Sequence, residues 1–453
     1  MKNKSLLLVG LLASVLFVIA AIAGCQQASI PKKINDINAL PSKTIIQPKG
    51  ASTGWSTNPD PAQGVKEAVE MAKNGLIGQP KYAIFYTTNY NPAAALSEIK
   101  TMLPGVKLHG ATSKLGIFSE KGYHYNPNGT IGIMLVSSDD VAFGVGSANY
   151  EGFASVQEAA ISAMREAMSS AGKTGKPDIV LISSSLPYEE EALAAIETVI
   201  GKDVPVIGGS AARAETPIVP DWALYAEKAT FKNGIMLTAV YTNLSVGWVF
   251  KGGFDRTEKS GAITKADGRT IFEIDNRPAV DVLDEWLGGE IRKGMREGLN
   301  MNLFTGLHPL YKILAAPDGS VYQLYIHEWP ASNDETTTKL STAARVEAGQ
   351  RVYLSYGAWQ TLLNRIGKLP HDAKVQGNML DKNPSFGFSV ICGSVGSNIP
   401  LNERGKMSIL ANEELGANVP YIGTFTSGED GQFPGIGNRH GNVLTSFVLI
   451  GGG

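Results

Sequence analysis

The chain has 453 residues, with 40 basic and 42 acidic side chains and a formal net charge of −2. No run of lysines and arginines breaks this balance, which excludes the charge pattern of nucleic-acid-binding proteins, and no nucleic-acid partner is expected. Only two cysteines are present, so a disulfide-rich scaffold is excluded as well.

The N-terminus has the features of a secretory signal. Lys2 and Lys4 precede an apolar run over residues 6–22, and Ile22-Ala23-Gly24-Cys25 resembles the lipobox of bacterial lipoproteins. We expect residues 1–24 to be removed and Cys25 to carry lipid, leaving 38 basic against 42 acidic side chains, or about −4. The alternative is an uncleaved membrane helix, because the run is close to spanning length. The cysteine at the junction favours the lipoprotein signal.

A polar, proline-punctuated segment follows the signal. Together with the lipidated cysteine it predicts a flexible tether over residues 25–53. The roughly 400 residues beyond it exceed what one hydrophobic core usually supports, so two domains are expected, over 54–265 and 266–453. No second apolar stretch of spanning length follows, which predicts a soluble protein apart from its lipid.

The first half of the chain alternates between strand and helix patterns. It predicts, in order, a helix from Pro61, a strand at 82–88, a helix from Pro92, a strand at 106–109, a hairpin of 129–138 against 140–148, a helix opened by a capping box at Ser155 and Glu158, a strand at 178–185, a helix at 189–201 and a strand at 204–209. This alternation predicts an α/β fold in which helices join parallel strands.

The second half is less periodic but continues the mixture. It predicts a hairpin over 308–329 about the turn at 317–319, a strand at 351–357, a helix at 358–367, a strand at 385–392, a helix at 403–416, a strand at 419–430 and a final strand at 440–450. The fold class is therefore a two-part, layered α/β architecture.

Small hydroxyl or amide residues end four strands of the first half, and ligands bind outside the carboxyl ends of strands in open α/β sheets. The alternative is that such residues make good turns. The predicted ligand-binding residues at these strand ends are Thr88, Thr112, Ser113, Ser184, Gly208, Gly209 and Ser210.

The stretch VPVIGGSAARAE (204–215) holds the strongest of these candidates. Its two glycines would let backbone amides approach a ligand, Ser210 offers a hydroxyl, and Arg213 offers a bidentate partner for a carboxylate. An alternative is a serine nucleophile at Ser210 with His109 or His440 as its base, which would make the protein a secreted serine hydrolase.

Other patterns that could indicate phosphate binding, catalysis or metal binding do not have the sequence context that these functions require. Residues 167–174 match a relaxed phosphate-binding loop, but they end a helix, where Gly172 supplies a left-handed cap. Glu189, Glu190 and Glu191 occupy the first turn of a helix, which acidic residues favour, so no catalytic role is predicted for them. The six histidines are scattered without a metal-binding spacing, and no metal site is expected.

Several stretches together resemble a known family. They are GATS at 110–113, PVIGGSA at 205–211, TIFEIDNRPAVDVLDEWLG at 270–288, HPL at 308–310, SVICGS at 389–394, GTFTSGEDGQF at 423–433 and HGN at 440–442. Their order, from about residue 54 to the C-terminus, resembles the FIST sensory domain in both its N-terminal and its C-terminal part.

This resemblance implies a sensor of small molecules, proposed to be amino acids or related metabolites, and no established catalysis. It adds Glu429, His440 and Asn442 as ligand-binding candidates, with Glu429 suited to an ammonium group. Two departures from the family pattern stand out: Val395 replaces the arginine of a Cys-x-x-Arg motif that begins at Cys392, and Gly441 splits a histidine–asparagine pair. No resident cofactor is expected, although some members resemble haem-based gas sensors, so a haem-binding sensor is a further alternative.

The combined expectation is a lipid-anchored, extracytoplasmic sensory protein that is not an enzyme. Because no output module is recognised, its signal would pass to a separate signalling or transport protein. Gln26 stands where an aspartate commonly retains lipoproteins at the inner membrane, so the outer membrane is favoured if the organism has one.

Overall fold

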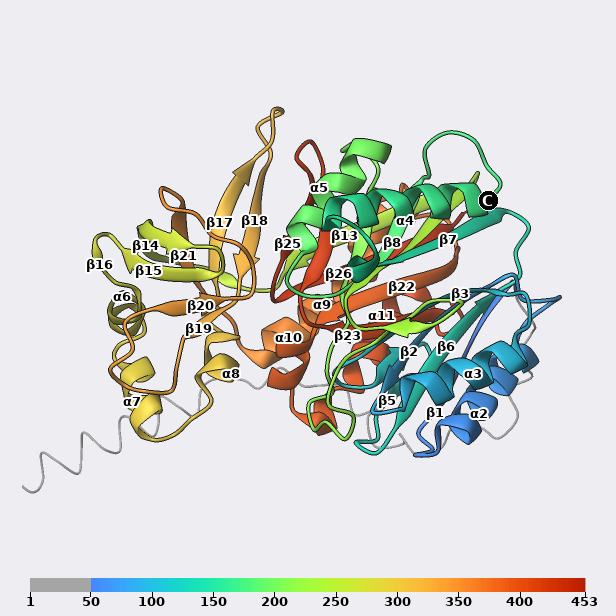
Figure 1. Cartoon of the computed structure of the whole chain (residues 1–453), viewed down its shortest axis with the longest axis horizontal. Helices are drawn as coiled ribbons and strands as arrows, with labels where there is room; N and C mark the ends of the chain where they lie inside the picture. Colours follow the sequence, from blue (N-terminus) through green and yellow to red (C-terminus); the bar gives the residue numbers. More distant parts are fainter. Residues whose placement is uncertain (1–49, 453) are drawn as a thin grey trace, which may run out of the picture. The chain divides into compact units, whose positions relative to one another are not determined.

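The computed structural model describes residues 50–452, so the predicted signal, the lipidated Cys25 and most of the predicted tether lie outside the described residues. Within this range the strands form three six-stranded sheets and one eight-stranded sheet (Figure 1). The first strand, β1 (Ala51–Ser56), already begins inside the segment predicted as tether. None of the helices between residues 50 and 452 combines the length and apolar character needed to cross a membrane.

The first six-stranded sheet comes from the N-terminal part of the chain. Its order is β1, β6 (Thr130–Val136), β2 (Tyr82–Thr88), β3 (Lys107–Thr112), β10 (Leu224–Tyr225) and β11 (Thr230–Phe231). Helices α2 (Pro61–Asn74) and α3 (Pro92–Met102) cover one face, and the apolar stripe of α2, which includes Val65 and Val69, is buried as predicted.

The second sheet combines strands from both halves of the chain. Its order is β25 (Gly437–Gly441), β24 (Glu429–Phe433), β9 (Val206–Ser210), β8 (Ile179–Ser184), β12 (Gly234–Thr242) and β7 (Val141–Asn149). Helices α4 (Val156–Ser170) and α5 (Glu189–Ile200) cover it. Ser155 caps α4 as predicted, and Gly172, with a φ of +65°, follows its end.

The third sheet is also shared between the halves. Its order is β13 (Ser245–Gly252), β26 (Leu444–Gly451), β22 (Pro384–Cys392), β23 (Tyr421–Thr426), β4 (Ile117–Ser119) and β5 (Gly122–His124). Helices α9 (Trp359–Gln376), α10 (Gly393–Asn398) and α11 (Lys406–Leu415) accompany it. Short 3₁₀ turns lie at Tyr150–Gly152 and Leu401–Glu403.

The remaining sheet is formed by residues 255–356 and has its own apolar cluster. Its order is β18 (Val321–Ile326), β17 (Leu310–Ala315), β21 (Arg351–Tyr356), β14 (Asp255–Asp267), β15 (Thr270–Ile274), β20 (Leu340–Thr342) and β19 (Glu328–Pro330), with β16 (Arg277–Pro278) beside β15. Its helices are α6 (Ala279–Trp286), α7 (Glu290–Arg296) and α8 (Met301–Thr305). The predicted hairpin about 317–319 is present as β17 and β18.

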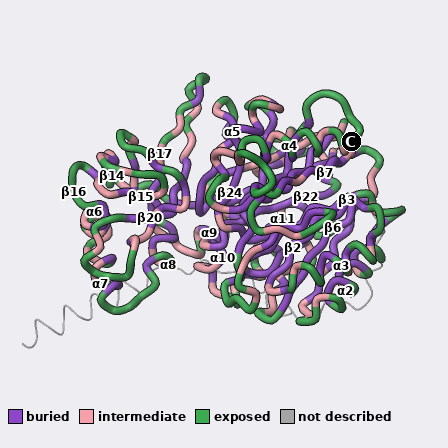
Figure 2. The backbone as a smooth tube through the Cα atoms, viewed as in Figure 1, coloured by how far each residue is buried: buried purple, intermediate pink, exposed green. Residues whose placement is uncertain are grey.

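The central core lies where the inner faces of the three six-stranded sheets meet. Ile84 of β2, Leu181 of β8 and Phe388 of β22 belong to one buried apolar cluster, while the helices pack on the other faces (Figure 2). As predicted, helices join parallel strands: α3 joins β2 to β3, and α5 joins β8 to β9. The mixed α/β class is confirmed.

One predicted pairing is wrong. The segments 129–138 and 140–148 do form strands, β6 and β7, but they do not pair as a hairpin: β6 pairs with β1 and β2, whereas β7 pairs with β12. Every residue of β6 is buried, so the strand needs neighbours on both edges and a covered surface on both faces. Distant strands supply these better than the adjoining segment does.

Candidate functional site

The predicted strand-end residues fall into two groups, and the first is occupied by structural hydrogen bonds. The Thr88 hydroxyl donates to the Ser113 carbonyl at 2.8 Å, the Phe425 amide donates to the Ser113 hydroxyl at 3.0 Å, and the Ala223 amide donates to the Thr112 hydroxyl at 3.0 Å. These hydroxyls fix loops to one another. At this edge of the sheet, these residues therefore act as turn and loop residues, which was the alternative to ligand binding.

The second group leads to ionisable side chains. The hydroxyls of Ser184 and Ser210 lie 3.2 Å apart, and Ser210 donates to Glu189 Oε1 at 2.6 Å. Gly208 and Gly209 have a packing role, because a Cβ at either position would overlap a neighbouring backbone carbonyl, that of Ile182 or of Gly428. These glycines thus let β9 lie close to β8 and β24.

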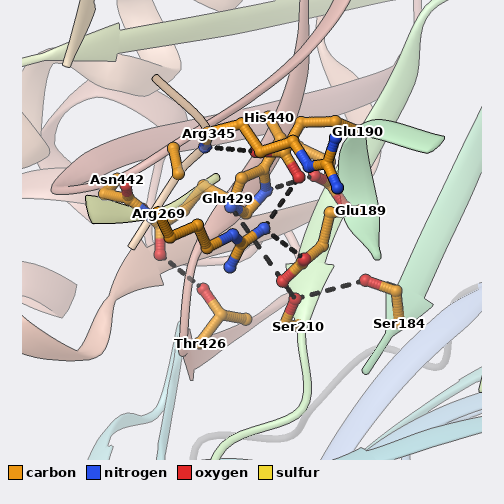
Figure 3. Close-up of polar contacts among 12 residues, drawn as sticks. Ser184, Glu189, Glu190, Ser210, Arg269, Arg345, Thr426, Glu429, His440 and Asn442 are labelled. Atoms are coloured by element: carbon orange, nitrogen blue, oxygen red, sulfur yellow. Dashed lines mark hydrogen bonds and ion pairs between the residues drawn. The ribbon is translucent and has the colours of Figure 1, made fainter. Parts of the chain in front are cut away.

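Glu189 lies in the first turn of α5 and is completely buried. The guanidinium of Arg269, from the turn between β14 and β15, lies 2.9 Å from Glu189 Oε2 and 2.7 Å from Glu190 Oε2 (Figure 3). The Arg345 backbone amide donates to Glu190 at 2.7 Å. Burial raises the pKa of Glu189, and His440, Arg269 and Ser210 partly offset this effect.

His440 brings the C-terminal strands into the same place. It lies opposite Asp430 in the β24–β25 pair, with Nδ1 2.8 Å from Asp430 Oδ1 and Nε2 4.0 Å from Glu189 Oε1. Burial alone would lower the pKa of His440, but Glu189, Asp430 and Glu190 outweigh it and raise this pKa to about 10. The imidazole is therefore charged at neutral pH. We call Glu189, Glu190, Ser210, Arg269, Asp430 and His440 the histidine–acid cluster.

The histidine–acid cluster and its surroundings hold buried polar atoms without a hydrogen-bond partner. They are Asp430 Oδ2, His440 Nε2, Arg269 Nε, Glu191 Oε2, Tyr150 Oη and Asn442 Nδ2. Two of them converge at Gly428, where a Cβ would lie 3.1 Å from His440 Nε2 and 3.3 Å from Asn442 Nδ2. Buried polar groups are nearly always hydrogen-bonded, so a concentration of unpaired atoms indicates a place for water or a ligand.

Glu429 differs from the carboxylates of the cluster. Its Oε1 accepts from the Thr426 hydroxyl at 2.8 Å and its Oε2 accepts from the Leu444 amide at 3.1 Å. Burial raises its pKa to about 8, against the lowering effects of those two donors, so it is mostly protonated at neutral pH. A neutral carboxyl group with both oxygens engaged is poorly suited to the predicted ammonium contact. The thiol of Cys392 is buried as well, and burial and Glu429 raise its pKa.

A small cleft reaches the cluster. Its volume is about 150 Å³, and it is lined by Glu190, Leu193, Ala194, Glu197, Lys312, Leu324, Ala344, Arg345, Asn438, Arg439 and His440. Pockets for drug-sized ligands usually occupy roughly 300–1,000 Å³. The cleft therefore suits a ligand of few atoms.

Two sequence predictions lie apart from this arrangement. Arg213 is exposed, so the arginine of the histidine–acid cluster is Arg269. Ser210 donates to a carboxylate, while His109 bonds Ser183 at 2.9 Å and Thr238 at 2.8 Å. Burial lowers the pKa of His109 to about 3. Among the described hydrogen bonds, none joins Ser210 to a histidine.

Sequence reasoning missed Glu189, Glu190, Arg269 and Asp430 as site residues. The acids at 189–191 were explained by the helix dipole, and they do lie in the first turn of α5. A usable signal was their position directly after the serines that end β8. Over residues 50–452, the structure holds no group of histidine, cysteine and acidic side chains that fits a metal ion.

Comparisons with known proteins identify two adjacent domains. The FIST N domain model matches residues 81–277 and the FIST C domain model matches residues 279–432. No curated protein matches the chain.

Among solved structures, cyanuric acid hydrolase from A. caulinodans matches with a TM-score of 0.28 and 11% identity, over 45% of this chain and 71% of that one. T. maritima PurL complexed with FGAR matches with a TM-score of 0.22 and 9% identity, over 88% and 72%. Likenesses this weak carry no conclusion about fold or function. The family models together cover most of the chain, and they describe sensory domains associated with small molecules. The chain therefore belongs to the FIST family, with a FIST N domain followed by a FIST C domain.

Proposed function

We propose that this FIST protein is a sensor that binds a small, amino-acid-like molecule at the histidine–acid cluster. The observation that carries the proposal is the set of buried polar atoms without a hydrogen-bond partner that includes Asp430 Oδ2, His440 Nε2 and Asn442 Nδ2. Leaving a buried donor or acceptor unpaired costs about 1–3 kcal/mol, and more for a charged group. A bound molecule that pairs these atoms recovers that free energy.

The chemistry of the unpaired atoms indicates a ligand with both donors and acceptors. Asp430 Oδ2 accepts only, which suits an ammonium group, whereas Asn442 Nδ2 and the charged His440 Nε2 donate, which suits a carboxylate or carbonyl oxygen. An amino acid carries both kinds of group on a few atoms. Ordered waters can occupy the same positions in the free protein and leave when the ligand binds.

The test is thermal unfolding of the purified protein against a panel of amino acids and small carboxylates. A ligand at 100 times its Kd adds about 2.7 kcal/mol to the free energy of unfolding, which raises the midpoint measurably. His440→Gln should abolish the rise. His371→Gln is the matched control, because His371 is half-exposed and lies 3.5 Å from Glu414 on the surface. A panel without effect on the wild-type midpoint would contradict the proposal.

We also propose that the protein is anchored by lipid on Cys25 outside the cytoplasm, in the outer membrane if one is present, and signals through a separate protein. The support is the lipobox-like Ile22-Ala23-Gly24-Cys25. Labelling of cells with a fatty-acid probe tests the anchor: the wild type should carry label and sediment with membranes. A Cys25→Ser variant that is labelled equally would exclude it.

Two rival functions have direct tests. A serine hydrolase using Ser210 predicts labelling by a fluorophosphonate that disappears in Ser210→Ala, yet Ser210 bonds to a carboxylate instead of an imidazole. A haem sensor predicts a Soret band in the purified protein, yet the cleft at His440 measures about 150 Å³. The geometry favours the small polar ligand over both.

A further inference from the structure

The cleft that opens onto His440 has charged groups of both signs around it. His440 forms part of its wall, and the imidazole lies 2.8 Å from Asp430 Oδ1 and 4.0 Å from Glu189 Oε1. Asp430 Oδ2 has no hydrogen-bond partner. Lys312 and Arg439 also line the cleft. A molecule that fills the cleft is thus near the acids that contact His440 and near the cations of Lys312 and Arg439.

Lys312 is a cation without a fixed partner. It lies on β17, half-buried, and its ammonium makes no hydrogen bond or ion pair with any side chain of residues 50–452. Burial lowers the pKa of Lys312, Glu190 and Glu347 oppose this effect, and Arg439 adds to it. Lys312 is therefore near these charges but neutralised by none of them.

Arg439 keeps its charge available as well. Its guanidinium donates to the backbone carbonyls of Asn438 at 2.7 Å and of Ile436 at 3.2 Å, and neither acceptor is charged. These bonds hold the group in place beside the cleft. The positive charge of Arg439 can therefore attract an anionic group of a ligand.

Glu190, which also lines the cleft, does not form an ion pair with Lys312 or Arg439. Its carboxylate is engaged by Arg269 and by the Arg345 amide. Burial would raise the pKa of Glu190, but His440, Arg269 and that amide outweigh it and keep the group ionised in these contacts. The negative charge of Glu190 is therefore paired within the histidine–acid cluster.

We propose that Lys312 determines ligand specificity by binding the carboxylate of the ligand, with Arg439 beside it, while Asp430 and Glu189 meet the ammonium group. This assignment rests on the proposed function and orients the ligand within the site. It predicts selectivity for short zwitterions, because the cleft has a volume of about 150 Å³ and the acids and the cations favour opposite charges on the ligand. An amine or an acid alone satisfies only one of these two preferences.

The test compares each stabilising amino acid with its amide, which lacks the carboxylate, and with its deaminated acid, which lacks the ammonium group. Binding to the full-length protein in detergent is measured by titration calorimetry for the wild type, Lys312→Met and Lys312→Gln. The matched control is Lys66→Met, since Lys66 is an exposed lysine on α2. Unfolding midpoints without ligand show that the variants are folded.

For the wild type we expect the amide and the deaminated acid to bind at least tenfold more weakly than the amino acid. Both Lys312 variants should lose at least tenfold in affinity for the amino acid and less than twofold for the amide, and Lys66→Met should lose nothing. Unchanged amino-acid affinity in the Lys312 variants, or an equal loss for the amide, would overturn the role of Lys312 and leave the proposed function standing. Absence of any wild-type binding would overturn both.

Discussion

Two strand edges of this protein have similar sequences but different environments. At the ends of β2 and β3, the hydroxyls of Thr88, Thr112 and Ser113 bond to backbone groups of adjoining loops. At the ends of β8 and β9, Ser184 and Ser210 lead to the buried carboxylate of Glu189. Polar strand ends therefore form a candidate site only where ionisable side chains from other parts of the chain join them.

The largest effect should come from removing the cation of the second edge. Arg269→Ala leaves Glu189 buried without the closer of its two cationic partners, and breaking a buried pair typically costs about 3–5 kcal/mol. Urea unfolding measures the loss. Arg277→Ala is the control, because Arg277 pairs with Glu285 on the surface, where a pair contributes about 0–1 kcal/mol. Equal losses in the two variants would show that the buried pair is not special.

The pH dependence of stability should also distinguish the edges. The pKa of His440 is raised from an ordinary 6.5 to about 10, so its stabilising contribution is complete below pH 6.5 and is lost as the pH rises toward 10. The total is on the order of a few kcal/mol. The free energy of unfolding, measured by urea titration at a series of pH values, should fall between pH 6.5 and 9.

The pH test has its own control. The pKa of Glu429 is raised from an ordinary 4.5 to about 8 in the native state. Its stabilising contribution is therefore complete below pH 4.5 and is lost as the pH rises to about 8. His440→Gln should therefore shrink the slope above pH 8 most, while Glu429→Gln should shrink it below pH 8. A wild-type slope that His440→Gln leaves intact would refute the charged state of His440.

A matched pair of hydroxyl deletions compares the edges directly. Ser210→Ala removes a hydrogen bond to a charged group, worth about 1.5–3 kcal/mol, and should weaken ligand binding because Glu189 loses a donor. Ser113→Ala leaves the Phe425 amide unpaired, at a cost of about 1–3 kcal/mol, but should leave ligand affinity unchanged. Unfolding and titration calorimetry on both variants separate the two roles. Weakened binding in Ser113→Ala would extend the site to the first edge.

The smallest effect is expected at Arg213. This side chain is exposed, so Arg213→Ala should change stability by less than about 0.5 kcal/mol and leave ligand affinity at the wild-type value. The same unfolding and calorimetric measurements apply. A loss of affinity by tenfold or more would restore Arg213 as the carboxylate partner that the sequence pattern indicated.

The sequence predicted elements better than it predicted partners. The stripe of α2, the cap of α4 and the β17–β18 hairpin follow from local spacing and are confirmed. The partners of β6 and β7 do not follow from local spacing. These strands pair with distant strands, because only those strands let them be buried on both faces.

Only some residues of the candidate site could be identified from the sequence, for the same reason. Ser210 and His440 were identified from strand-end and family patterns, and they lie in one cluster. Arg269 could not be identified from the sequence, because only the fold brings the turn between β14 and β15 to the first turn of α5. Glu189 was visible in the sequence, but its helix-terminal position offered a sufficient explanation.

The most direct test is a crystal structure with the amino acid that stabilises the protein most. We expect ligand density whose ammonium group contacts Asp430 Oδ2 and whose oxygen atoms accept from at least one of His440 Nε2, Asn442 Nδ2 and Lys312 Nζ. Density for the amino acid elsewhere, with only water at these atoms, would contradict the assignment of the histidine–acid cluster as the sensing site.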